Sequence, residues 1–105
     1  MSRDSATELA RAVSAYVAAL GESAEVEPPT TRSWTSITFS GDRHLLGVCF
    51  RGDGASVAAG RFAAGLADRE FDLRDHVLAD IAIVAEERAP EQIRLTLEAL
   101  TVEAG

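Results

Sequence analysis

The sequence contains no lysine, only one cysteine and no long apolar run, and each scarcity limits what the chain can be. Because Cys49 has no second cysteine to pair with, an intrachain disulfide is excluded and a reducing, cytoplasmic location is favoured. No stretch approaches the ~20 apolar residues of a membrane span, and the first residues lack the apolar core of a signal peptide. All ten basic residues are arginine, which is typical of a GC-rich bacterial genome and indicates nothing about a site.

Length and charge indicate one acidic globular domain over residues 1–105. Apolar residues make up 47% of the chain and charged residues 26%, as in ordinary globular proteins, so we expect a single core without metal or disulfide support. The formal net charge of -7 would repel a phosphate backbone. Nucleic acid is therefore not an expected partner, and neither is a membrane.

An amphipathic helix is predicted over residues 5–20. Ser5 followed by Glu8 has the spacing of a capping box, and Gly21 stands where a left-handed C-terminal cap is needed. The apolar side chains that recur at helical spacing are Leu9, Val13, Tyr16, Val17 and Leu20.

The next segment, residues 22–32, contains three glutamates and a pair of prolines, which exclude a helix. We expect an extended linker there, or a short edge strand near Val26. A hairpin of strands 34–40 and 43–51 follows, with a two-residue turn at Gly41-Asp42. That turn sets a register in which one face pairs Phe39 with His44, Ile37 with Leu46, and Thr35 with Val48.

A short alanine-rich helix is predicted over residues 55–67, and a strand over residues 75–86. The strand is apolar on nearly both faces, so we expect it to lie centrally in the sheet. One face would carry Val77, Ala79, Ile81 and Ile83, and the other Leu78, Asp80, Ala82 and Val84.

The last segment, residues 91–103, fits either a helix or a strand. The strict alternation of Ile93 to Glu98 favours the strand, provided that a bulge near Ala99 shifts the phase once. The element order α-β-β-α-β-β then predicts an α+β fold: a mainly antiparallel four-stranded sheet with two helices on one face.

The sequence contains no arrangement of residues that indicates catalysis. His44 and His76 are the only histidines, with Asp42, Asp75 and Asp80 nearby. His76 and Asp80 are four residues apart on one strand, or about 13 Å, which is too far for a hydrogen bond. The expected alternation places the two histidines on opposite faces. We therefore assign them structural roles and predict no catalytic residue, metal or cofactor.

Two further motifs have ordinary explanations. Cys49 lies in an apolar strand opposite Trp34, with Arg51 as the only supporting charge, which favours a buried structural thiol over a nucleophile. The loop 51–56 contains two glycines but lacks the Gly-Lys-Ser/Thr ending of a phosphate-binding loop, so it is interpreted as a turn. Two acidic clusters lack the spacing of oxygen ligands around a glycine that a calcium site needs: Glu22, Glu25 and Glu27, and Glu86, Glu87 and Glu91.

Surplus apolar surface is the most informative feature, because two helices can cover only one face of the sheet. The second face would be too apolar to remain in water, which predicts a non-enzymatic protein-interaction module that forms a homodimer through this face or an exposed strand edge. The alternative hypothesis is a small-molecule-binding protein or minor enzyme with a cleft near His76, Asp80 and Trp34. The residues expected at the interface or ligand face are Trp34, Leu45, Cys49, His76, Leu78, Asp80 and Val84.

Overall fold

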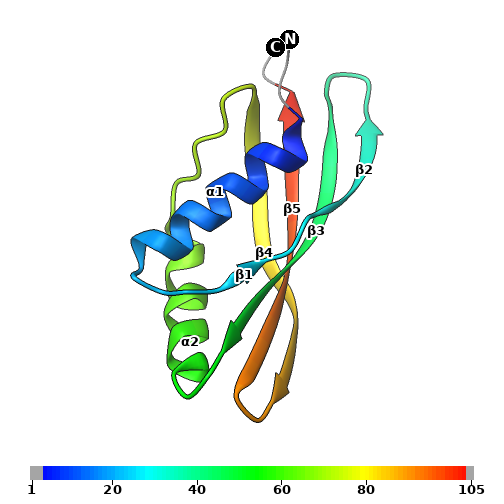
Figure 1. The fold of residues 1–105 in the computed structure, drawn as a ribbon. Coiled ribbons are helices and arrows are strands. Elements are labelled where there is room, and N and C mark those ends of the chain that lie inside the picture. Colours follow the sequence, from blue (N-terminus) through cyan, green and yellow to red (C-terminus); the bar gives the residue numbers. More distant parts are fainter. Residues whose placement is uncertain (1–3, 104–105) are drawn as a thin grey trace.

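Two helices and five antiparallel strands are formed by residues 4–103, the part of the chain described by the computed structural model (Figure 1). The predicted α+β class, with one antiparallel sheet and two helices, is confirmed, but the sheet has five strands instead of four. The fifth is the short edge strand expected near Val26. In chain order the elements are α1 (Ser5–Ala19), β1 (Glu25–Val26), β2 (Thr30–Thr35), β3 (Ser40–Arg51), α2 (Ala55–Leu66), β4 (His76–Ala89) and β5 (Gln92–Glu103).

The caps of α1 agree only in part with the sequence pattern. The helix starts after Asp4, whose carboxylate accepts a hydrogen bond from the backbone N–H of Ala6. At the other end Gly21 has a φ of 74°, as predicted, and its N–H donates to a carbonyl of the last turn. The capping box of Ser5 and Glu8 is wrong, because both side chains bind residues of other elements.

The core lies between one face of the sheet and the two helices, which both cover that face (Figure 1). Every second residue of β5 is buried there, from Ile93 to Thr101. The two helices meet at Tyr16, whose hydroxyl donates a hydrogen bond of 2.8 Å to the Phe62 carbonyl. The helices contribute Leu9, Val13, Tyr16, Val17, Ala55, Ala58, Ala59, Phe62 and Leu66 to this core.

The hairpin of β2 and β3 turns at residues 36–39 and not at Gly41-Asp42, so the predicted register is wrong. The Ser36 N–H donates to the Phe39 carbonyl at 2.7 Å and closes the turn. Gly41 instead lies within β3, where a Cβ would come within 1.9 Å of the Thr101 carbonyl oxygen. Glycine is thus required for the close approach of β5. The observed pairs are Thr35–Ser40, Trp34–Gly41, Ser33–Asp42, Arg32–Arg43, Thr31–His44 and Thr30–Leu45.

β4 is an edge strand, although its apolar character predicted a central one. The sheet order is β1-β3-β5-β4, with β2 also paired to β3, so β3 and β5 are the central strands. β5 confirms the strand interpretation of residues 91–103, and its alternation runs through Ala99 without the expected phase slip.

Two β-bulges interrupt β4 and change which face its side chains take. The pairing with β5 shifts at Ala79, between Leu78 and Asp80, and again at Val84. Because of the first shift, Leu78 and Ile81 both face the helices, whereas Asp80 faces the other side of the sheet. The alternation expected from the sequence is therefore wrong for the first residues of this strand.

Candidate functional site

The side of the sheet away from the helices, called the open face below, carries several of the residues predicted at an interface. Residues directly opposite one another on paired strands share a face, so the registers define rows that cross β2, β3, β5 and β4 in that order. The first row holds Trp34, Gly41, Val102 and Val77; the second Arg32, Arg43, Leu100 and Asp80; the third Thr30, Leu45, Glu98 and Ala82.

These three rows expose apolar side chains to solvent. Leu45 is 43% exposed and Val77 is 56% exposed. Trp34 is half-buried because its ring lies against Gly41, where a Cβ would be only 3.0 Å from a ring carbon. The three rows therefore form a partly apolar surface with a flat aromatic ring at one side.

Charge is distributed unevenly along the second and third rows. Arg32 and Arg43 lie next to each other on β2 and β3, while Asp80 and Glu98 lie on β4 and β5. An ion pair of 3.8 Å joins Arg43 to Glu98, and both side chains are largely exposed. The surface is thus positive toward the β2 edge and negative toward the β4 edge.

An ion pair covers the other half of the open face. The Arg94 guanidinium donates to both carboxylate oxygens of Glu27, at 2.8 Å and 2.6 Å. This bond holds the pKa of Glu27 below its ordinary value. The pair lies over Gly47, where a Cβ would come within 2.5 Å of Arg94. Cys49 lies directly opposite Arg94 in the register and is buried, as predicted for a structural thiol.

Two of the predicted interface residues, Leu78 and His76, face the helices, and a third, Val84, lies at a bulge. Leu78 faces the helices and packs against the core, and Val84 is a bulge residue that is 53% exposed. His76 also lies on the helix side, against α1, because the bulge at Ala79 separates it from Asp80. Asp80 and Trp34 share the open face but occupy its opposite edges. The structure therefore does not bring together the cleft residues His76, Asp80 and Trp34.

His44 is fully buried and hydrogen-bonded on both ring nitrogens. Its Nδ1 is 2.8 Å from the Thr31 hydroxyl, and its Nε2 is 3.0 Å from the Thr101 hydroxyl. The Thr101 hydroxyl donates to the Asp42 carbonyl, so it accepts the proton of Nε2, and Nδ1 accepts from Thr31. Burial lowers the pKa of His44, mainly through desolvation. A neutral imidazole therefore links β2, β3 and β5.

His76 lies on the same side of the sheet as His44, and not on the opposite face as predicted. Its Nδ1 is 3.1 Å from the buried carboxylate of Glu8, which also accepts the backbone N–H of Asp75 at 3.0 Å. These bonds attach α1 to the start of β4. Within residues 4–103, no group of three or more His, Cys, Asp or Glu side chains could hold a metal ion. Both histidines have structural partners, as the sequence indicated.

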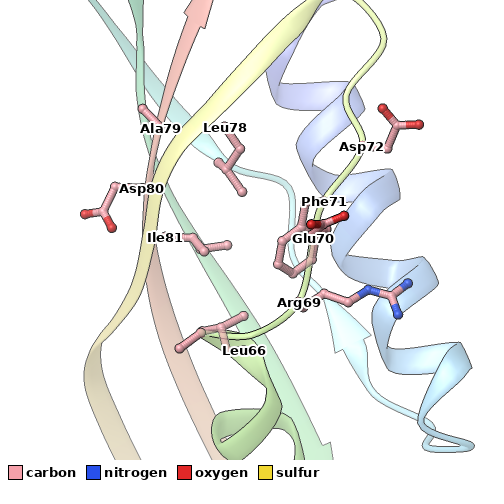
Figure 2. A pocket seen from close by; sticks show the side chains of 10 residues that line it. Leu66, Arg69, Glu70, Phe71, Asp72, Leu78, Ala79, Asp80 and Ile81 are labelled. Carbon is pink, nitrogen blue, oxygen red and sulfur yellow. The ribbon is translucent and has the colours of Figure 1, made fainter.

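A groove of about 770 Å³ lies between β4 and residues 67–75, the segment that leads into this strand (Figure 2). The side chains of Leu66, Phe71, Leu78 and Ile81 point into it, whereas Asp80 points away (Figure 2). These apolar residues are the walls of the site that we call the β4 groove.

The rim of the β4 groove carries charge of mainly one sign. Glu70 and Asp72 are exposed on the segment opposite β4. The only arginine that lines the groove in the described part of the chain, Arg69, lies 5.4 Å from the ring centre of Tyr16 and so points toward α1. The β4 groove thus combines apolar walls with an acidic rim.

The β4 groove exists because the helices cover β3 and β5 more fully than β4. Leu97 on β5 is completely buried, whereas Leu78 and Ile81 on β4 are only half-buried. Sequence patterns missed this site because Phe71 belongs to a segment without helical or strand periodicity. The one available signal was an aromatic residue among the charged residues that follow α2.

No protein-family model, curated protein or solved structure matches the chain. In the described residues, neither helix has the length and apolarity that crossing a membrane requires. The open face and the β4 groove are therefore the two candidate functional sites of the described residues.

Proposed function

We propose that this protein is a non-enzymatic interaction module that forms a homodimer through the open face. The observation that carries the proposal is the self-complementary charge of the second row, from Arg32 and Arg43 at one side to Asp80 at the other. Exposed apolar side chains border this row on both sides, and such a grouping is typical of an interaction surface.

A twofold axis parallel to the strands, passing between β3 and β5, makes this charge pattern fit itself. Such an axis places β2 of one copy over β4 of the other, so Arg32 faces Asp80 of the second copy. Trp34 then faces Val77, and each contact occurs twice in the dimer. Two sheets that pack in this aligned way bury their facing side chains in a layer about 10 Å thick.

A charge swap tests this geometry directly. Sedimentation velocity at micromolar concentration should show a dimer for the unmodified chain. Arg32→Asp or Asp80→Arg alone should raise the dimer dissociation constant by about tenfold or more, because each places like charges opposite one another twice. The double variant restores opposite charges and should recover the original constant to within about threefold.

Exposed apolar residues provide the matched control. Leu45→Glu should prevent dimerisation, because Leu45 is 43% exposed in the single chain and faces Glu98 of the second copy. It should lower the stability of the single chain by less than about 1 kcal/mol, since residue 45 also lies opposite Glu98 of its own chain. Val57→Glu on α2, where the side chain is 67% exposed, should have no effect on association. A chain that sediments as a monomer at every concentration tested, or a double variant that fails to recover, would show that the open face is not the interface.

A further inference from the structure

The free edge of β4 lies directly beside the β4 groove. β4 pairs only with β5, and its other edge has no strand partner among residues 4–103. In Figure 1 this edge faces the connecting segment and α2, and Figure 2 shows the groove on the same side. A strand added to this edge would therefore place its helix-side residues in the groove, beside Leu78 and Ile81.

The charges around this edge select the partner. Carboxylates of Glu70 and Asp72 line the groove, while Asp80 of β4 points away from it and Glu87 lies 3.7 Å from Arg94. Among the arginines of this region, Arg88 is paired with Glu86 at 2.7 Å and Arg69 lies over Tyr16. A second copy of β4 would add the carboxylates of Asp80, Glu86 and Glu87 to an acidic rim, so charge disfavours self-pairing along this edge.

We infer that the edge of β4 binds an extended segment of another protein in which apolar residues alternate with lysine or arginine. The apolar side chains enter the β4 groove, while the basic side chains reach the carboxylates of the rim. The backbone of the segment pairs with β4 between the two bulges, at Asp80 to Ile83. This site lies on the helix side of the sheet and does not depend on dimerisation through the open face.

An extended segment fits this groove better than a small molecule does. Small-molecule sites enclose most of their ligand, whereas the β4 groove is open to solvent along one side. The adjacent strand edge also offers backbone donors and acceptors in a row, which an extended chain can match one by one.

The test is titration of a fluorescent ten-residue peptide of alternating lysine and valine into the full chain. We expect saturable binding, with NMR amide shift changes concentrated at residues 66–72 and 78–83, which form the groove and the adjacent strand edge. Glu70→Lys combined with Asp72→Lys should weaken binding by about tenfold, through loss of attraction at two exposed positions. Glu25→Lys combined with Asp53→Lys changes the net charge equally, away from the groove, and should weaken binding by less than about twofold.

Two further peptides separate backbone pairing from simple charge attraction. The same peptide with all of its backbone amide nitrogens methylated cannot donate along either edge and should lose binding. A peptide of alternating glutamate and valine should not bind. Equal weakening by both double variants, full binding of the methylated peptide, or shift changes mainly outside residues 66–72 and 78–83 would overturn the inference. Concentration-dependent shifts of residues 78–83 without peptide that persist in the Leu45→Glu variant would show that a second copy occupies the edge instead.

Discussion

The two faces of the sheet are built from the same strands but differ in how far their side chains are buried. On the helix side, β3 and β5 bury nearly every side chain, and the polar groups that remain are paired, with His44 between Thr31 and Thr101. On the open face, Arg94 and Glu27 shield one half, and apolar residues of the other half meet water. The difference indicates that burial on the helix side supplies most of the stability, whereas the open face leaves apolar side chains in contact with water.

The largest expected effect on stability comes from comparing the substitution of one leucine on each face of the sheet. Leu97→Ala on the helix side should lower the free energy of unfolding by about 2–5 kcal/mol, because it leaves a cavity in a closed core. Leu45→Ala on the open face should change it by less than about 0.5 kcal/mol in the single chain. Urea unfolding at low protein concentration measures both. A cost of Leu45→Ala that grows with concentration would show that association buries this face.

Gly41 tests whether the close approach of β3 and β5 constrains the sequence. Gly41→Ala should destabilise the fold by about 1–3 kcal/mol, since its Cβ would overlap the Thr101 carbonyl. Gly60→Ala in α2 is the matched control: nothing lies within 4 Å of the added atom, and alanine favours the helix, so stability should rise by about 0.5–1 kcal/mol. Thermal unfolding of the two variants compares them. Equal effects would contradict the assigned role of Gly41.

A pH titration separates the buried histidine from the exposed charges. Because burial lowers the pKa of His44 below its ordinary value of 6.5, the unfolded chain takes up this proton first as the pH falls. The stabilising contribution is therefore complete above pH 6.5 and declines below it, by at most about 1.4 kcal/mol per pH unit. His44→Gln should abolish this slope in urea unfolding curves. A slope that survives the substitution must come from another group.

The smallest expected effect concerns the ion pair on the open face. Glu27→Gln should destabilise the fold by about 0.5–1 kcal/mol, because the paired side chains remain partly exposed. The pKa of Glu27 is lowered by Arg94, so this contribution is present at neutral pH and is lost as the pH falls below 4.5. Added salt should reduce it. Faster reaction of Cys49 with a thiol reagent in the variant would show that the pair also shields this thiol.

Sequence patterns predicted the helices and strands better than the pairing between strands. Helical spacing from Leu9 to Leu20 and strict alternation from Ile93 to Glu98 correctly indicated a helix and a strand, because each pattern reflects one buried face. The hairpin register failed at Gly41: a glycine that permits close backbone approach looks the same in a sequence as one that permits a turn.

The predicted interface failed in part for a related reason. One extra residue at Ala79 moves Leu78 to the helix side and leaves Asp80 on the open face, and no local feature of the sequence marks that bulge. The placement of β4 at the edge depends on contacts with residues far away in the chain. The β4 groove could not be predicted, because it follows from where the helices stop covering the sheet.

The bulges of β4 also bear on aggregation. A long apolar edge strand is a template for fibres, since each added chain offers the next one the same unpaired edge. In β4, the bulges at Ala79 and Val84 divide the pairing with β5 into three short stretches, residues 76–78, 80–83 and 85–89. Under the proposed binding mode, a partner would pair with one short stretch, while the bulges on either side disfavour an open-ended stack of copies. We therefore expect Ala79 and Val84, whose bulges no sequence pattern predicted, to protect the exposed edge of β4 from polymerisation.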